Sequence, residues 1–166
     1  MPELTSGPAA DPGSYNFMPI CIDLRDRQVL MVGAGRVALS KTRRLLPYTT
    51  QITVVAPEVR EEFRSPEFSA LRIVEEAFSE QHLEGVWLMY ICTGDHELNH
   101  EIKRCAQLNR VLASVCDDPG SCDFVSPAIH RQDGMTIAVS SNGRAASRSV
   151  ALRDRIRELA GQLFPI

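Results

Sequence analysis

Short, continuously apolar runs recur along residues 17–118, separated by polar or helix-like segments. Such runs are typical of strands in a parallel sheet, because helices cover both faces of that sheet. The alternation of strands and helices predicts an α/β fold of the Rossmann type, a doubly wound parallel sheet with right-handed crossovers. The predicted strands are 28–33, 51–56, 71–74, 86–92 and 111–116.

Two segments between these strands have the periodicity of amphipathic helices. Segment 36–46 is ended by Pro47, and segment 95–109 follows the fourth predicted strand. In the second helix we expect Lys103 to face solvent. The residues predicted to share a face are Val37, Ala38, Lys41 and Leu45 in the first helix, and Leu98, Ile102 and Cys105 in the second.

The pattern changes after Asp117. A loop over 117–123 leads to one further predicted strand, 135–141, and a helix over 144–164. A single strand with one helix buries little surface and leaves an open edge, so we expect this element to form a homodimer. Residues 1–16 are rich in Pro, Gly and Ser, which predicts a flexible tail. The predicted parts are therefore the tail 1–16, a sheet domain 17–118 and a dimerisation and substrate element 119–166.

Composition and charge exclude several classes of protein. Of 166 residues, 44% are hydrophobic and 23% charged, and the net charge of −3 argues against a nucleic-acid binder. No apolar run approaches the roughly 18 residues of a membrane helix, and the N-terminus lacks the features of a secretory signal. The five cysteines form no C-x-x-C pair and mostly lie in apolar runs, which predicts reduced thiols. We expect a cytoplasmic protein without nucleic-acid or membrane partners.

A glycine turn follows the first strand and opens the first helix: Gly33-Ala34-Gly35-Arg36-Val37-Ala38. Gly33 permits the tight turn, Gly35 lets the backbone approach a pyrophosphate, and the small Ala38 allows close packing of helix and strand. The N–H groups at the start of the helix attract phosphate. Strand, turn and helix in this order predict that the sheet domain binds a nicotinamide dinucleotide.

The acidic residue that usually binds the ribose diol is missing from the end of the second strand. The first acidic residue after this strand is Glu58, which lies a little further from Gly35 than the usual spacing of roughly 20 residues. Arg60 is nearby and would suit the 2′-phosphate of NADP. Glu58 precedes it and would repel that phosphate, so the sequence favours NAD without excluding NADP. A short-chain reductase is disfavoured because no tyrosine has a lysine four residues later, and a methyltransferase because the strand lacks its terminal acid.

The run His96-Glu97-Leu98-Asn99-His100 matches the zinc-protease pattern H-E-x-x-H. It lies in the first turns of a helix that follows a Rossmann strand, and no third, glycine-spaced histidine follows. The apolar stripe of this helix leaves both histidines facing solvent. We therefore expect no metal at this motif.

An ordered set of motifs resembles the precorrin-2 dehydrogenase family, whose fold also forms the N-terminal module of sirohaem synthases. The set spans Met18 to Arg157, nearly the whole predicted fold. It comprises Met18-Pro19-Ile20, Val29 to Ala38, Thr53 to Pro57, Cys92-Thr93 with Asn99, Val115 to Pro119, Phe124 to Ala128 and Ile137 to Gly143.

The resemblance implies that NAD⁺ takes a hydride from precorrin-2 to give sirohydrochlorin in sirohaem biosynthesis; some family members are also sirohydrochlorin ferrochelatases. Asp117 falls on the family's key aspartate. A carboxylate after the fifth strand would accept a substrate proton, or deprotonate a pyrrole nitrogen before metal entry, although Asp117-Asp118-Pro119 also fits a simple turn. The expected cofactor contacts are Gly33, Ala34, Gly35, Arg36, Val37, Pro57, Glu58 and Thr93.

Precorrin-2 carries many carboxylates, which suits arginine donors. Arg131, Arg144 and Arg148 are candidates, and simple surface solvation explains them equally well. Ser141 and Asn142 lead into the last helix, whose first N–H groups suit a propionate; by the resemblance Ser141 lies near the active site. The expected substrate contacts are Ser141, Asn142, Arg144 and Arg148.

The sequence departs from the family twice. After Gly143 the usual Ser-Pro step is replaced by Arg144-Ala145-Ala146, and the sequence ends at Ile166 where relatives continue. Three functions stay open. The first is an NAD-dependent precorrin-2 dehydrogenase, with or without ferrochelatase activity, and the second is a non-catalytic NAD- or tetrapyrrole-binding sensor or carrier. The third is a dehydrogenase that acts on another small molecule, which rests on the fold alone.

Overall fold

The computed structural model describes residues 17–116 and 118–163. The chain divides into two compact units, Cys21–Phe124 and a second unit made of residues 17–20 with 125–163. The predicted tail 1–16 lies outside the described residues. In the part of the chain that is described, no helix has the length and apolar character needed to cross a membrane.

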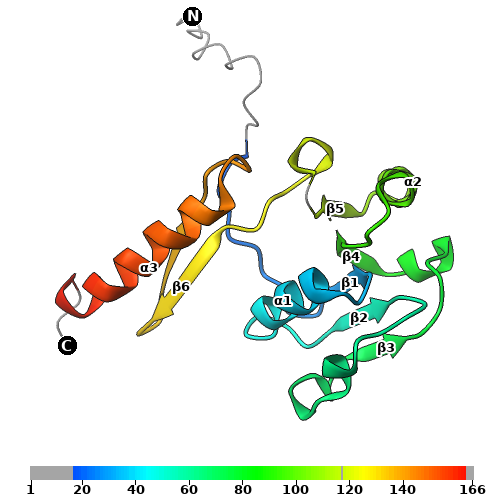
Figure 1. Cartoon of the computed structure of the whole chain (residues 1–166), viewed down its shortest axis with the longest axis horizontal. Coiled ribbons are helices and arrows are strands. Elements are labelled where there is room, and N and C mark those ends of the chain that lie inside the picture. The colour runs from blue at the N-terminus through cyan, green and yellow to red at the C-terminus, as the bar shows by residue number, and fades with distance from the viewer. Residues whose placement is uncertain (1–16, 117, 164–166) are drawn as a thin grey trace, which may run out of the picture. The chain divides into compact units, whose positions relative to one another are not determined.

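The first unit contains a five-stranded sheet in the order β3-β2-β1-β4-β5, with every neighbouring pair parallel (Figure 1). The predicted α/β fold of the Rossmann type is therefore confirmed. The chain leaves β1 toward β2 on one side and returns to β4 on the other, so the direction of winding reverses between β1 and β4. The strands are β1 (Gln28–Val32), β2 (Ile52–Val55), β3 (Arg72–Val74), β4 (Val86–Ile91) and β5 (Leu112–Val115).

Helices α1 (Arg36–Leu45) and α2 (His96–Leu108) pack on opposite faces of this sheet. Alternate residues of a strand face opposite sides, so Val29 and Met31 of β1 pack with the α1 cluster while Leu30 and Val32 pack with the α2 cluster. All four side chains are almost completely buried. This explains why the run is continuously apolar.

The buried faces of both helices differ from the predicted ones. Val37 is 44% exposed and Leu98 is 39% exposed, whereas Lys103, which we expected in solvent, is only 6% exposed. Helical periodicity counts apolar residues and does not register a polar residue that is buried with a partner. The buried residues are Ala38, Leu39, Thr42 and Leu45 in α1, and Asn99, Ile102, Lys103 and Ala106 in α2.

Short 3₁₀ turns, rather than α-helices, cover the connections on either side of β3. Phe63 and Phe68 are both buried there, with ring centroids 5.2 Å apart. The two rings close the edge of the core beside α1. The turns are η1 (Glu61–Arg64), η2 (Pro66–Phe68), η3 (Glu80–Leu83) and, after β5, η4 (Pro119–Ser121).

The second unit contains an antiparallel hairpin, β6 (Ala128–Gln132) with β7 (Met135–Val139), and the helix α3 (Ala146–Leu163), which packs on both strands. Asp133 and Gly134 form the two-residue connection with φ of 50° and 75°, as type I′ hairpin turns require. Strand β6 was not among the predicted strands. The argument that β7 lacks an edge partner within its own chain is therefore wrong, because β6 supplies that partner.

Candidate nucleotide-binding site

The glycine turn lies at the point where the winding of the sheet reverses, between the carboxyl ends of β1 and β4. Gly33 has φ of +96°, and its N–H donates to the Val55 carbonyl oxygen at 2.8 Å. A Cβ at this position would lie 2.5 Å from the carbonyl oxygen of Cys92 and 3.1 Å from the nitrogen of Thr93. Only glycine fits this backbone and this approach. In open α/β sheets, ligands bind at this reversal point.

Gly35 is a glycine for a different reason. It caps α1 with φ of −80°, which any residue can adopt, and a Cβ there would meet no protein atom within 4 Å. The first turn of α1 carries no acidic residue, and no side chain caps its N-terminus. The first N–H groups of a helix lack intrahelical partners and attract anions. The space at Gly35 therefore fits the close approach of a pyrophosphate.

The other expected cofactor contacts surround this turn. Ala34 and Ala38 are buried and pack the turn closely, while Arg36 and Val37 are exposed in the first turn of α1. Pro57 and Glu58 are exposed just beyond β2, the neighbour of β1. The structure thus brings the expected contacts together at the carboxyl edge of three adjacent strands.

Arg60, the residue that would suit a 2′-phosphate, is already paired with a carboxylate. Its Nη2 lies 2.6 Å from Glu62 Oε1, and this hydrogen bond raises the pKa of the Arg60 guanidinium above its ordinary value. A 2′-phosphate would have to compete with Glu62 for this guanidinium.

Thr93 lies in the short loop between β4 and α2. Its hydroxyl donates to Asn99 Oδ1 at 2.5 Å and accepts from the Asp95 N–H at 3.2 Å. The Asn99 side-chain amide donates to the Thr93 carbonyl oxygen at 3.3 Å. Asp95 caps α2 by accepting from the Leu98 N–H at 3.1 Å. Hydrogen bonds to the side chain and to the carbonyl oxygen of Thr93 therefore fix the loop that borders the glycine turn.

Cys92 and Cys116 follow the neighbouring strands β4 and β5 and form a disulfide, with their Cα atoms 5.2 Å apart. This differs from the expectation that all five cysteines are reduced thiols. Parallel strands in register bring the residues that follow them side by side, and sequence spacing does not reveal which residues meet in this way. The free cysteines are Cys21, Cys105 and Cys122.

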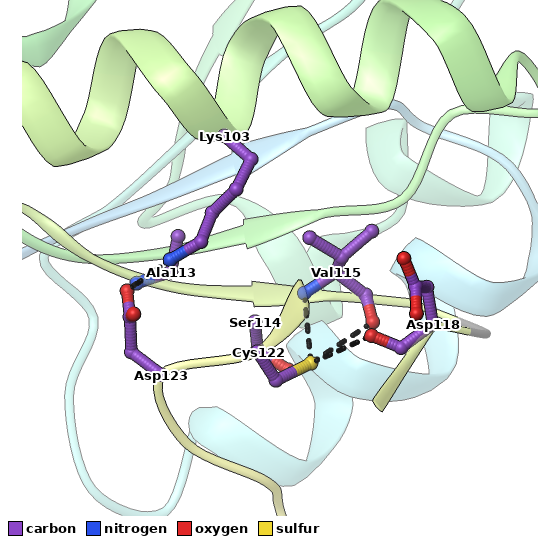
Figure 2. A network of polar contacts seen from close by, with 7 residues as sticks. All are labelled: Lys103, Ala113, Ser114, Val115, Asp118, Cys122 and Asp123. Atoms are coloured by element: carbon purple, nitrogen blue, oxygen red, sulfur yellow. Dashed lines mark hydrogen bonds and ion pairs between the residues drawn. The ribbon is translucent and has the colours of Figure 1, made fainter. Parts of the chain in front are cut away.

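The segment after β5 is tied back against that edge strand, as Figure 2 shows. The Asp123 carboxylate accepts from the Ala113 N–H at 2.9 Å and pairs with Lys103 from α2. The Cys122 sulfur lies 3.2 Å from both the nitrogen and the carbonyl oxygen of Val115. Side chains thus satisfy backbone groups that the edge strand would otherwise leave unpaired.

Asp117, the expected catalytic residue, lies outside the described residues. Its neighbour Asp118 accepts a hydrogen bond from the Ser121 hydroxyl at 2.5 Å, and His100 Nε2 lies 3.9 Å from the same carboxylate oxygen. A hollow of about 370 Å³ opens beside these groups. It is lined by His100, Lys103, Arg104, Gln107 and residues 120–123.

The expected substrate contacts of the second unit gather where α3 begins. Ser141 Oγ accepts from the Ala145 N–H at 2.8 Å, and Asn142 Oδ1 accepts from the Phe17 N–H at 2.8 Å. Arg144 and Arg148 are exposed on the adjoining turns. Both polar side chains therefore shape the entry to α3, and the expected residue Arg131 lies apart from them on β6.

The histidines of the H-E-x-x-H run are exposed, as predicted. Asn99, between them in this run, is 3% exposed and faces the Thr93 loop. Among the described residues, no group of three or more His, Cys, Asp or Glu side chains is arranged to hold a metal ion.

Comparisons with known proteins agree with this geometry. Siroheme synthase 3 of Aeromonas hydrophila is 35% identical over 150 residues, covering 89% of this chain and 32% of that protein. Siroheme synthase of Citrobacter koseri is 34% identical over 148 residues, with the same coverages of 89% and 32%. The chain therefore spans about a third of the length of these relatives.

A solved structure described as SirC, precorrin-2 dehydrogenase, superposes with a TM-score of 0.72 at 26% identity, covering 89% of this chain and 71% of that one. These matches confirm the resemblance inferred from the motifs. Residues 20–128 match the family described as putative NAD(P)-binding, and this match contains the whole sheet with its glycine turn. The chain belongs to this NAD(P)-binding family.

Proposed function

We propose that this chain catalyses the NAD-dependent dehydrogenation of precorrin-2 to sirohydrochlorin. The observation that carries the proposal is the glycine turn at the sheet's reversal point, within a fold that superposes on a precorrin-2 dehydrogenase with a TM-score of 0.72. Similarity to siroheme synthases over 89% of the chain supports the same pathway. Bound NAD⁺ would supply the hydride acceptor.

The chain's own residues bind and orient the dinucleotide in this proposal. The N–H groups at the start of α1 bind the pyrophosphate above Gly35, where no protein atom intrudes. Glu58, exposed beyond β2, accepts hydrogen bonds from the ribose hydroxyls. The same carboxylate repels a 2′-phosphate, which makes NAD the preferred cofactor.

We assign the proton-accepting role to Asp117. Transfer of a hydride from a C–H bond of the substrate to NAD⁺ would leave a carbocation, and a carboxylate that removes a proton from the neighbouring atom would complete the double bond. Asp117 follows β5, whose carboxyl end adjoins that of β4 at the edge where Rossmann ligands bind. The substrate's carboxylates would be bound by Ser141, Asn142, Arg144 and Arg148.

We further propose that the chain acts in the cytoplasm as a homodimer formed by its second unit. Met135 and Leu152 are each 53% exposed and Leu159 is 44% exposed, on the hairpin and helix of that unit. Large exposed apolar side chains gathered on one small unit favour association with a second copy.

The test is incubation of the chain with precorrin-2 and NAD⁺ while NADH absorbance is followed. We expect absorbance to rise with the wild type and to stay flat with Asp117→Asn, although that variant binds NAD normally. Asp26→Asn is the matched control, because Asp26 lies in a surface turn before β1. Addition of ferrous iron to the product tests the ferrochelatase activity.

A flat trace with wild-type protein that still binds both NAD and tetrapyrrole would overturn the dehydrogenase proposal. It would favour the non-catalytic sensor or carrier instead. No binding of NAD at all would also overturn the dehydrogenase proposal, and a tetrapyrrole-binding carrier would then be the remaining function.

A further inference from the structure

We propose that Asn99 is a positioning residue for the nucleotide site, acting through the Thr93 loop. The inference rests on the proposed binding of NAD at the glycine turn. Asn99 belongs to the motif Cys92-Thr93 with Asn99, in which no role follows for it from the sequence. It lies in the second turn of α2, on the helix that follows β4.

Asn99 is an unusual residue for its location. It is the fourth residue of α2, and it is only 3% exposed. Asparagine is a weak helix former, and burial of an amide is unfavourable unless the amide is hydrogen-bonded. Both halves of this amide are satisfied, and both partners belong to Thr93: the hydroxyl at 2.5 Å and the carbonyl oxygen at 3.3 Å.

This double contact fixes one residue of the loop from two sides. The Thr93 hydroxyl lies 2.5 Å from Asn99 Oδ1 and 3.1 Å from the Asp95 carbonyl oxygen, both acceptors, and it accepts from the Asp95 N–H at 3.2 Å. The hydroxyl is therefore engaged within the loop. What the loop presents to a ligand is its backbone, held in place by the amide of Asn99.

The position of this backbone matters because it touches the glycine turn. A Cβ at Gly33 would lie 2.5 Å from Cys92 O, 2.8 Å from Cys92 C and 3.1 Å from Thr93 N. The Cys92–Thr93 peptide is thus one wall of the turn that receives the dinucleotide. Removal of Asn99 breaks the hydrogen bonds that join this wall to α2, while the Cys92 N–H still donates to the Val32 carbonyl oxygen of β1 at 2.8 Å.

The experiment measures NAD affinity and melting temperature for Asn99→Leu, Thr93→Val and the double variant. We expect each single variant to raise the Kd for NAD by about fivefold to tenfold, the range of one or two neutral hydrogen bonds. The double variant should raise the Kd by less than the product of the two single effects, because both changes break the shared contact between the Thr93 hydroxyl and Asn99 Oδ1. Thr93→Ser retains the hydroxyl and should therefore raise the Kd for NAD less than Thr93→Val does.

Thr42→Val is the matched control for loss of a buried hydrogen bond. Thr42 is completely buried in α1, and its hydroxyl donates to the Ala38 carbonyl oxygen at 2.9 Å, away from the loop. This variant should lower the melting temperature and leave the Kd unchanged. With precorrin-2 present, Asn99→Leu should raise the KM for NAD⁺ more than it lowers kcat.

Three outcomes separate the explanations. If Asn99→Leu lowers the melting temperature as Thr42→Val does and leaves the Kd for NAD unchanged, Asn99 is only structural and the inference is wrong. Additive effects of Thr93→Val and Asn99→Leu would show that Asn99 does not act through Thr93. If the wild type itself fails to bind NAD, the proposed function has failed, which is a different result.

Discussion

Gly33 and Gly35 are two residues apart and need the absence of a side chain for different physical reasons. Gly33 is constrained by the protein, through a positive φ and the carbonyl oxygen of Cys92. Gly35 is constrained by nothing in the protein, since its φ is ordinary and the space beside it is open. A residue that the fold does not require to be glycine points to a ligand.

This contrast predicts different results for two alanine variants. Gly33→Ala should lower the free energy of unfolding by about 1–3 kcal/mol, because it combines an unfavourable φ with a contact to backbone. Gly35→Ala should change stability by less than about 0.5 kcal/mol and weaken NAD binding by about tenfold or more, because the added methyl group occupies the ligand's space. Thermal denaturation and NAD titration measure the two effects. Equal stability losses in both variants would contradict this explanation of the turn.

The cysteines also give a residue-scale prediction. Protein purified without reductant and then denatured should show three reactive thiols, those of Cys21, Cys105 and Cys122. Reduction should expose all five. Cys92→Ser should release the Cys116 thiol and add one to the unreduced count. A count of five before reduction would contradict the disulfide.

At the scale of elements, apolar runs and breakers predicted all five strands of the sheet and both of its helices within a residue or two. In the second unit, β7 and α3 were predicted and β6 was not. Strand β6 reads Ala-Ile-His-Arg-Gln, and its mixed polarity resembles a loop. The signal that could have revealed it is Asp133-Gly134, a two-residue hairpin turn preceding the predicted strand.

The site was predictable only where local chain geometry creates it. Gly33 and Gly35 follow from the strand–turn–helix order, whereas the role of Asn99 depends on a loop hydrogen bond. Lys103 was placed in solvent because its partner, Asp123, lies 20 residues further along the chain. Periodicity within one helix carries no information about such a partner. The pairing of Cys92 with Cys116 was missed for the same reason.

The Lys103–Asp123 pair joins α2 to the segment after β5, and we expect it to contribute to the free energy of unfolding. Asp123→Ala should lower the free energy of unfolding by about 1–3 kcal/mol, because it leaves the almost fully buried Lys103 without its carboxylate. It also removes the acceptor of the Ala113 N–H. Glu67→Ala is the control: its pair with Arg43 is exposed on both sides, and its loss should cost less than about 1 kcal/mol. Similar losses in urea denaturation would refute the claim that burial sets the difference.

At the scale of the whole molecule, the sheet unit already holds the proposed dinucleotide site, and the second unit carries the remaining expected substrate contacts. The hairpin satisfies one edge of each of its strands, so edge pairing no longer argues for a dimer. What remains is the exposed apolar surface of β7 and α3. The dimer proposal therefore depends on side-chain burial, which a single charged substitution can test.

Leu152→Glu should convert a homodimer into a monomer at micromolar concentration, because a carboxylate placed in an apolar interface loses hydration without gaining a partner. The control is Leu108→Glu, since Leu108 is 82% exposed at the end of α2 in the sheet unit. That variant should keep the wild-type mass in light scattering. If the wild type is already monomeric, the dimer proposal is wrong. If Leu152→Glu stays dimeric, the interface lies elsewhere on the chain. NAD affinity should be unchanged in both variants, because the glycine turn and the Thr93 loop lie wholly within the sheet unit.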